Sequence, residues 1–472
     1  MSDIATEGLA ASGPTRAQKL YFATWRWHFY AGLYVIPFLI MLAVTGILMV
    51  WFTAIAPEYG DRIALAPQAA TLTLPQQETA ALAAYPGGKI GQYIAPYDAQ
   101  TPALFRVDLG EGGRMLALDP YSGAILRDTE NGATWNDFIT HIHGELLIGD
   151  NGGWGDLMIE VATCLALLMV STGLYLVWPR NGRGLRDMLV PNLAAKGRAW
   201  WKSLHSVMGF WISILLVFFL ITGLAWAGIW GGKFVQAWST FPAEKWDAVP
   251  LSDSTHAGMN HTAAETVPWA LEQTLMPESG SAAGVTGLPE GVPVVLESVV
   301  ALGRAIGFDG RFQVAAPADD AGVWTLSQDS MSYDSPDPTT DRTVHVDQYS
   351  GKILASVGFA DYGLAGQAMA VGIALHEGQM GLWNVILNIA FCLVVVFVAI
   401  SGAVMWWKRR PVGAGRLAAP PLPAEVPMWK GAVLLGLFLS MAFPVLGLTL
   451  IAVLLFDAVV LGSVPVLKRA FS

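Results

Sequence analysis

The chain has 472 residues, of which 54% are hydrophobic and only 14% are charged, a balance typical of integral membrane proteins. Its net charge of −10 argues against nucleic acid as a partner, because phosphate binding needs concentrated Lys and Arg. The two cysteines, Cys164 and Cys392, both lie in apolar stretches, which argues against a disulfide framework, an iron–sulfur cluster and a Cys-based zinc site.

Four apolar stretches approach or exceed the roughly 20 residues needed to cross a bilayer. They cover 29–54, 157–178, 205–230 and 383–407. The first is too long for the core of a signal peptide and has no small-residue cleavage site after it, so we expect it to remain as a membrane helix. A fifth stretch, 431–466, could be a hairpin of two short helices broken around Pro444–Gly447, or one kinked span with an interfacial piece.

The distribution of charge predicts the orientation. Arg and Lys dominate the N-terminal tail, the 179–203 loop and the start of the 408–430 linker, whereas Asp and Glu dominate 55–155 and 232–380. Because basic flanks stay cytoplasmic, we expect a cytoplasmic N-terminus and two large outer segments, periplasmic if the cell is Gram-negative. The expected divisions are tail and first helix 1–54, first outer domain 55–155, two helices with their loop 156–230, second outer domain 231–380, fourth helix 381–410, linker 411–430 and C-terminal membrane hairpin 431–472.

The sequence also contains an internal repeat. The same residue types follow His28 and His205 at identical spacings: Gly32, Thr45 and Gly46 in one case, and Gly209, Thr222 and Gly223 in the other. In the outer segments, LALDPYSGAIL around Asp119 matches VHVDQYSGKIL around Asp347. Alternating apolar residues beside a D-x-Y-S-G turn predict a β-hairpin. Each half is therefore expected to be a helix, an outer α+β domain, a histidine and a second helix.

Four of the eight histidines recur in this repeat near helix ends. His28 and His205 are expected to open helices on the cytoplasmic side, and His143 and His376 to open helices on the outer side. Two helices that each supply one imidazole at the same depth can hold a haem iron between two axial ligands. Such an iron has no vacancy for oxygen and transfers electrons. We therefore predict two b-type haems, one bound by His28 and His205 and the other by His143 and His376.

Small residues near these histidines would let a flat macrocycle approach the helix backbone; they are Gly32, Gly209, Thr45 and Thr222. His141 could replace His143 as the ligand or hydrogen-bond to it, but the His-Gly context shared with His376 favours His143. A single histidine at a membrane interface is more often an anchor than a ligand, so the prediction depends on the pairing by repeat and depth.

The remaining histidines carry weaker signals. His256 and His261 are five positions apart in a Ser/Thr-rich outer segment, where solvated loop residues are expected in preference to metal ligands. His345 falls in a predicted strand and is expected to be structural.

Several motifs resemble the PepSY-associated transmembrane helix family, which includes bacterial ferric-siderophore reductases and iron-regulated membrane proteins. They are W-R-x-H at Trp25–His28, D-P-Y-S-G at Asp119–Gly123, H-G-x-L-L-x-G at His143–Gly149, W-K-x-L-H at Trp201–His205 and S-G-x-x-M-W-W-K-R-R at Ser401–Arg410. The resemblance covers about residues 18–412. It implies a four-helix haem-binding core with two extracytoplasmic PepSY-like domains, haem ligation by the paired histidines and reduction of iron chelates in the periplasm.

The sequence is compatible with two functions that belong to different classes. The first is a haem-dependent oxidoreductase of the bacterial inner membrane, surrounded by lipid, that takes electrons from a cytoplasmic reductase or quinol and reduces a ferric siderophore or other ferric chelate. Oxygen donors hold Fe(III) tightly and Fe(II) far less so, which releases the iron. No hydrolase or phosphate-loop motif indicates acid–base catalytic residues. The second is a non-enzymatic regulator or assembly factor that binds an envelope protein or peptidase.

Overall fold

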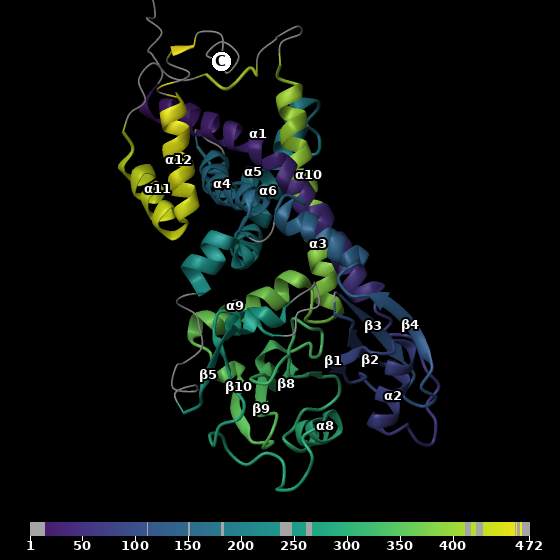
Figure 1. The fold of residues 1–472 in the computed structure, drawn as a ribbon. Coiled ribbons are helices and arrows are strands. Elements are labelled where there is room, and N and C mark those ends of the chain that lie inside the picture. The colour runs from purple at the N-terminus through teal and green to yellow at the C-terminus, as the bar shows by residue number, and fades with distance from the viewer. Residues whose placement is uncertain are drawn as a thin grey trace, which may run out of the picture. The chain divides into compact units, whose positions relative to one another are not determined.

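The chain divides into two compact units (Figure 1). One combines 1–40, 158–220 and 394–472, and the other combines 41–157 and 221–393. The computed structural model describes residues 15–110, 112–149, 152–180, 184–236, 248–260, 267–410, 417–421, 428–457, 459 and 463–464. Among these residues, the first unit is helical, and the second contains the β-sheets.

Among the described residues, four helices are long and apolar enough to cross a membrane, which confirms the four predicted spans. They are α1 (Arg16–Val50, continued by η1, Trp51–Ile55), α4 (Trp154–Val177), α6 (Arg198–Gly223, continued by η2, Leu224–Trp226) and α10 (Leu382–Trp407). Even the shortest has 24 residues, which at about 1.5 Å per residue exceeds the roughly 30 Å of a bilayer core. Each contributes residues to both units.

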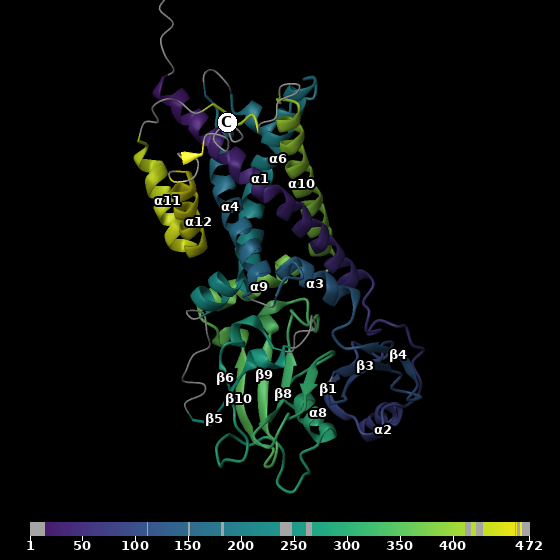
Figure 2. The ribbon, with the colours of Figure 1, turned by 45° about the horizontal axis from the view of Figure 1, so that its top comes forward.

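The helical unit also holds the short α5 (Arg186–Leu189) and a C-terminal pair, α11 (Lys430–Ala442) and α12 (Pro444–Phe456). Pro444 occupies the first turn of α12, where the missing N–H costs no helical bond. The two helices lie side by side in Figures 1 and 2. Each has 13 residues, or about 20 Å, which is too short to cross a bilayer core. The C-terminal stretch is thus a hairpin of two short helices instead of one kinked span.

The second unit is built on an eight-stranded antiparallel sheet in the order β10-β9-β8-β7-β1-β2-β3-β4. Its strands are β1 (Lys89–Ile94), β2 (Ala103–Asp108), β3 (Gly113–Leu118), β4 (Ile125–Glu130), β7 (Gln313–Ala315), β8 (Val323–Gln328), β9 (Arg342–Asp347) and β10 (Ile353–Gly358). The first strands of the two repeats, β1 and β7, pair with each other and place Tyr93 opposite Val314. The two predicted outer domains are therefore halves of one sheet.

The D-x-Y-S-G hairpins predicted from the sequence are confirmed as β3–β4 and β9–β10. In the first turn the Asp119 carboxylate accepts hydrogen bonds from Tyr121 N (2.9 Å) and Ser122 Oγ (2.6 Å). Gly123 and Gly351 close the two turns with φ of 75° and 67°, a left-handed conformation that glycine adopts without steric cost.

The two halves of the sheet share one apolar core. Phe105 and Leu116 of the first half belong to the same buried cluster as Val344 and Val346 of the second. The helices α2 (Leu74–Ala84) and α8 (Leu296–Ala305) pack on this core. The other elements of the unit are η3 (Gly228–Val235), β5 (Leu251–Thr255), η5 (His256–Met259), η6 (Trp269–Leu271), β6 (Leu275–Pro277), η7 (Pro338–Thr340) and η8 (Phe359–Asp361).

Two short helices, α3 (Trp135–Glu145) and α9 (Leu364–Glu377), precede α4 and α10. The prediction that His143 and His376 open spanning helices is wrong, because these residues lie in the last turns of α3 and α9. A left-handed residue, Leu146 after α3 and Gly378 after α9, ends each helix before the next one begins. The apolar pattern of the sequence predicted only α4 and α10, the long helices that follow α3 and α9.

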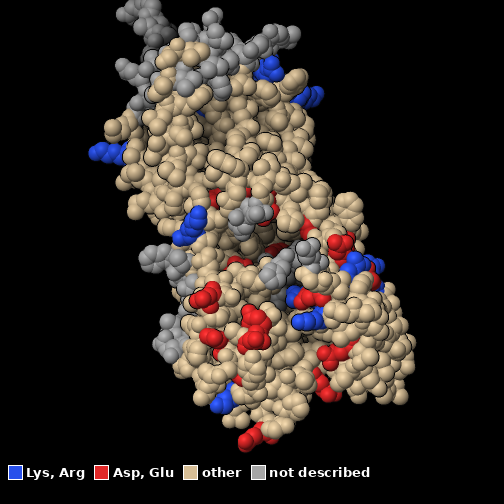
Figure 3. All heavy atoms as spheres, in the orientation of Figure 1, with Lys and Arg blue, Asp and Glu red and all other residues tan. Residues whose placement is uncertain are grey.

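Charge divides between the units on the face shown in Figure 3. Asp and Glu gather there over the sheet-containing unit, while uncharged residues cover most of the helical unit. This division is expected when one region lies in lipid and the other in water.

Candidate functional site

The first pair of candidate ligands lies in the helical unit. Nδ1 of His28 on α1 is 3.0 Å from Oγ1 of Thr172 on α4. Nδ1 of His205 on α6 is 2.9 Å from Oγ of Ser401 on α10. A Cβ added at Gly402 would lie 3.5 Å from Cε1 of His205 and 3.8 Å from Cδ1 of Ile36 on α1, so the His205 ring packs beside the helix that carries His28. The structure thus places the His205 ring beside the helix of His28, the histidine that the repeat paired with it.

The second pair belongs to the sheet-containing unit and makes the same kind of contact. Nδ1 of His143 on α3 is 2.7 Å from Oγ1 of Thr45 on α1. Nδ1 of His376 on α9 is 2.8 Å from Oγ1 of Thr222 on α6. Thr45 and Thr222, which we expected beside a macrocycle, are the residues whose hydroxyl groups contact these two rings.

A glycine follows each of these hydroxyl residues, and its backbone packs against the same ring. A Cβ added to the glycine would approach the Cε1 atom of the ring at these distances: Gly46 to His143, 3.8 Å; Gly173 to His28, 3.3 Å; Gly223 to His376, 3.2 Å; Gly402 to His205, 3.5 Å. Each imidazole therefore packs against a Ser/Thr–Gly pair of a spanning helix. The distance between the added Cβ and the ring is shortest at Gly223.

The hydroxyl groups indicate which ring nitrogen is available. Three of the four donate to a carbonyl of their own helix: Thr45 to Met41 O at 2.8 Å, Thr172 to Leu168 O at 2.9 Å and Ser401 to Val398 O at 2.8 Å. A hydroxyl has one hydrogen, so its oxygen accepts the Nδ1–H of the imidazole. The ring then carries its lone pair on Nε2, the nitrogen left for a metal.

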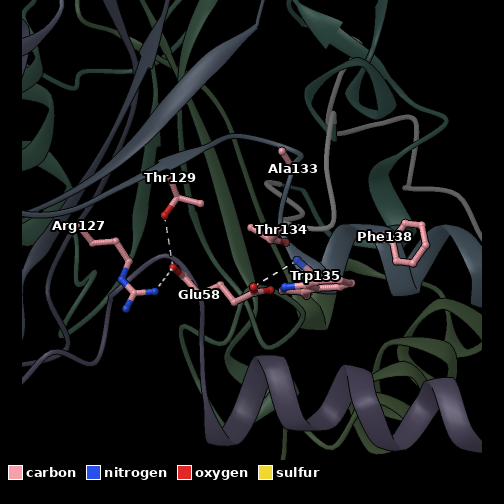
Figure 4. A pocket seen from close by; sticks show the side chains of 7 residues that line it. All are labelled: Glu58, Arg127, Thr129, Ala133, Thr134, Trp135 and Phe138. Carbon is pink, nitrogen blue, oxygen red and sulfur yellow. Dashed lines mark hydrogen bonds between the residues drawn. The ribbon is translucent and has the colours of Figure 1, made fainter.

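Polar contacts fix the short helix that carries His143. The Thr134 side chain caps α3 in a reciprocal box with Asp137. The carboxylate of Glu58 accepts hydrogen bonds from the backbone N–H groups of Trp135 (3.2 Å) and Asn136 (2.8 Å). Glu58 lines a pocket at this end of α3, where its carbonyl accepts hydrogen bonds from nearby side chains (Figure 4).

The helix that carries His376 is held at its other end. Asn388 on α10 donates its side-chain amide to the carbonyls of Leu375 (2.9 Å) and His376 (2.8 Å). Asn384 donates to the carbonyl of Leu375 at 2.8 Å. These bonds satisfy carbonyls that the end of α9 leaves unpaired.

The geometry separates His143 from its sequence neighbour. His143 contacts Thr45, and burial lowers the pKa of its imidazole to about 4, so the ring is neutral at pH 7. Neutral imidazole is the form that binds metals. His141 is exposed and lies 2.8 Å from Glu145 of its own helix. His143 is therefore the better placed ligand of the two.

Two predicted small residues lie away from the rings. A Cβ at Gly32 would meet Met169 Cε at 3.4 Å, and a Cβ at Gly209 would have open space around it for 4 Å. Conversely, sequence reasoning missed Thr172 and Ser401 as partners of the histidines. The sequence did contain a pattern that could have identified them, because each spanning helix carries a Ser/Thr–Gly pair and each pair contacts one histidine ring.

The prediction that His256 is solvated is wrong, because this side chain is fully buried. Its Nε2 lies 2.9 Å from Nε2 of His345, which is also buried and lies in β9 as expected. Its Nδ1 lies 2.9 Å from the carbonyl of Thr274. His261 lies outside the described residues. Within the described part of the chain, no three His, Cys, Asp or Glu residues form a group that could hold a metal ion.

A buried acidic cluster lies near the second pair. The β8–β9 loop contributes Asp329, Asp334 and Asp341, and Glu377 follows His376 directly. Burial raises the pKa of Asp334, Asp341 and Glu377. At Asp334 the buried guanidinium of Arg311, whose Nε lies 3.1 Å from the carboxylate, opposes this rise. The sequence analysis did not single out these acidic residues.

No curated protein matches this chain. The sequence model of the family described as PepSY-associated TM region matches residues 25–409. The match covers the paired histidines and both halves of the sheet. The chain belongs to the family of the PepSY-associated TM region.

Proposed function

We propose that this chain is a transmembrane electron-transfer protein that holds two b-type haems, one on His28 and His205 and the other on His143 and His376. One observation carries the proposal: four imidazoles from the two repeats are held through Nδ1 by a Ser/Thr–Gly pair. Metal-binding histidines use this arrangement, because a hydrogen bond at one ring nitrogen orients the other toward the metal.

The residues fit the cofactor in two respects. In the described part of the chain, Nε2 of His28, His143 and His205 makes no hydrogen bond, so each is free to bind iron. No atom would lie within 4 Å of a Cβ added at Gly209, four residues after His205, so the helix surface there is unobstructed. A haem with both axial positions filled supplies one reversible electron and no site for oxygen. The chain's own residues orient the rings.

The proposed setting is the bacterial inner membrane, with the N-terminus cytoplasmic and the sheet-containing unit periplasmic. The donor would be a cytoplasmic reductase or quinol, and the acceptor a ferric siderophore or other ferric chelate. One electron converts Fe(III) to Fe(II), which oxygen ligands hold less tightly. The basic residues that flank the helices and the acidic outer surface support this orientation.

A visible spectrum of the purified full-length protein tests the cofactor. We expect a b-type reduced spectrum and two haems per chain by pyridine haemochrome assay. Protein without haem would contradict the proposal and favour a non-enzymatic regulator that binds an envelope protein or peptidase.

A stopped-flow experiment tests the acceptor. The protein is reduced with dithionite, separated from it and mixed with a ferric hydroxamate chelate and an Fe(II)-specific dye. We expect one Fe(II)–dye complex for each haem reoxidised. If the haems stay reduced, ferric hydroxamates are not acceptors, and the electron-transfer role then needs another substrate.

A further inference from the structure

An indole N–H group without a partner lies beside the second pair of histidines. The ring of Trp226, at the end of η2, meets the ring of His376 edge to face, with 6.4 Å between centroids. In the described part of the chain its Nε1 is buried and makes no hydrogen bond. Gly223 packs against the His376 ring, and Trp226 follows Gly223 by three residues. Trp226 therefore lies about one helical turn farther along the chain.

A neighbouring tryptophan shows what a buried indole normally does. Nε1 of Trp269 donates to the carbonyl of Ala225 at 2.9 Å. A buried donor without an acceptor destabilises a fold, so native proteins rarely leave one unpaired. Trp226 therefore needs an acceptor that the chain itself does not provide.

A second group of this kind lies on the helix that carries His143. Oγ1 of Thr140 is buried and without a hydrogen-bond partner among the described residues. Thr140 precedes His143 by three residues on α3, so the two share a face of the helix. Each candidate ligand of this pair thus has an unpaired donor nearby.

We infer that Trp226, assisted by Thr140, donates hydrogen bonds to the carboxylates of the porphyrin bound by His143 and His376. The inference rests on the proposed function. The edge of a haem b is apolar except for two propionate groups, which are the acceptors that an indole N–H and a hydroxyl can satisfy. Hydrogen bonds to a charged acceptor are the strong ones, so this contact would retain and orient the macrocycle.

Haem release to apomyoglobin tests the inference. Full-length protein carrying His205→Ala, in which only the second site remains, is reconstituted with haem or with its dimethyl ester, which lacks the carboxylates. Trp226→Phe keeps the ring and removes the N–H, and we expect it to release haem roughly tenfold faster. With the ester, whose neutral carbonyl oxygens accept only a weaker hydrogen bond, Trp226→Phe should accelerate release of the porphyrin much less. Thr140→Val should show the same pattern with a smaller effect.

Trp135→Phe is the matched control, because it removes an exposed indole N–H from the helix that carries His143. It should leave both release rates unchanged. If Trp226→Phe accelerates release of haem and ester equally, the indole acts by packing and the inference is wrong. If it accelerates neither, the inference is also wrong while the proposed function stands. If the parent protein takes up no porphyrin, both fail.

Discussion

The two pairs of histidines make the same contact on different supports. His28 and His205 lie on spanning helices, and so do the Ser/Thr–Gly pairs that hold them. His143 and His376 lie on the short helices α3 and α9, and only their Ser/Thr–Gly partners lie on spanning helices. The contact therefore does not require that the histidine's own helix cross the membrane.

This difference makes the second pair depend on the sheet-containing unit. Glu58 fixes the start of α3, and Gln379, just after α9, donates its side-chain amide to the carbonyl of Met331 in the β8–β9 loop at 3.0 Å. The hydroxyl contacts of the first pair lie within the four spanning helices. Changes in the sheet-containing unit should therefore affect one haem and spare the other.

Removal of a ligand has the largest expected effect. His28→Ala or His205→Ala should remove one haem and leave the other, and His143→Ala or His376→Ala should do the converse, because an iron with one axial ligand loses the bond that orients it. Double variants within a pair should lose no more than the single ones, and variants across pairs should lose both haems. Pyridine haemochrome assays count the haems. If all four single variants kept two haems, the pairing would be wrong.

Acid should destabilise the sheet-containing unit through its buried histidine pair. Burial lowers the pKa of His256 to about 4 and that of His345 well below its usual value, while both titrate near 6.5 in the unfolded chain. Between these values the unfolded state binds more protons, so stability present above about pH 6.5 is lost as the pH falls toward 4. For His256 this amounts to about 3 kcal/mol.

Thermal melts of wild type and His256→Gln at several pH values measure this effect. The wild-type melting temperature should fall more steeply than that of the variant between pH 6.5 and 4. The raised pKa values of Asp334 and Asp341 act in the opposite direction, because stability from their protonated forms is lost as the pH rises toward 8. Both proteins share that contribution, so the difference isolates the histidines. Parallel curves would refute the prediction.

Loss of a hydroxyl should weaken one site only. Thr45→Val or Thr222→Val removes the hydroxyl partner of an Nδ1 atom at the second pair, and Thr172→Val does so at the first. Loss of such partners typically lowers metal affinity about 10- to 100-fold. Haem titrations measure the change. Thr163→Val is the control, since Thr163 is buried in α4 and bonds to Ile159 O of its own helix. An equal effect of the control would mean that the hydroxyls act through the helix.

The smallest effect is expected at the support of α3. Glu58→Ala removes the carboxylate that binds two backbone N–H groups, a capping contact worth about 1 kcal/mol. Haem should bind roughly fivefold more weakly at the second site and unchanged at the first. Glu290→Ala, in an exposed loop, is the control. If both sites weakened equally, the proposed dependence on the sheet-containing unit would be wrong.

The sequence by itself determined the spans, the repeat and the hairpins. Apolar length, charge flanks and the D-x-Y-S-G turns are local signals, and each depends on residues that are neighbours in the chain. The repeat also selected four histidines, because identical residue types recurred at identical spacings. It did not reveal α3 and α9. These helices are short and partly polar, and the longer apolar stretch that follows each of them was the only helix that the pattern predicted.

Only the tertiary structure decided which segments meet. The pairing of β1 with β7 joins strands separated by more than two hundred residues and merges two expected domains into one sheet. The packing of distant segments also buries His256 against His345 and places four histidine rings against Ser/Thr–Gly pairs. A strand edge or a ring nitrogen can be satisfied by many partners, and the packing of distant segments selects one.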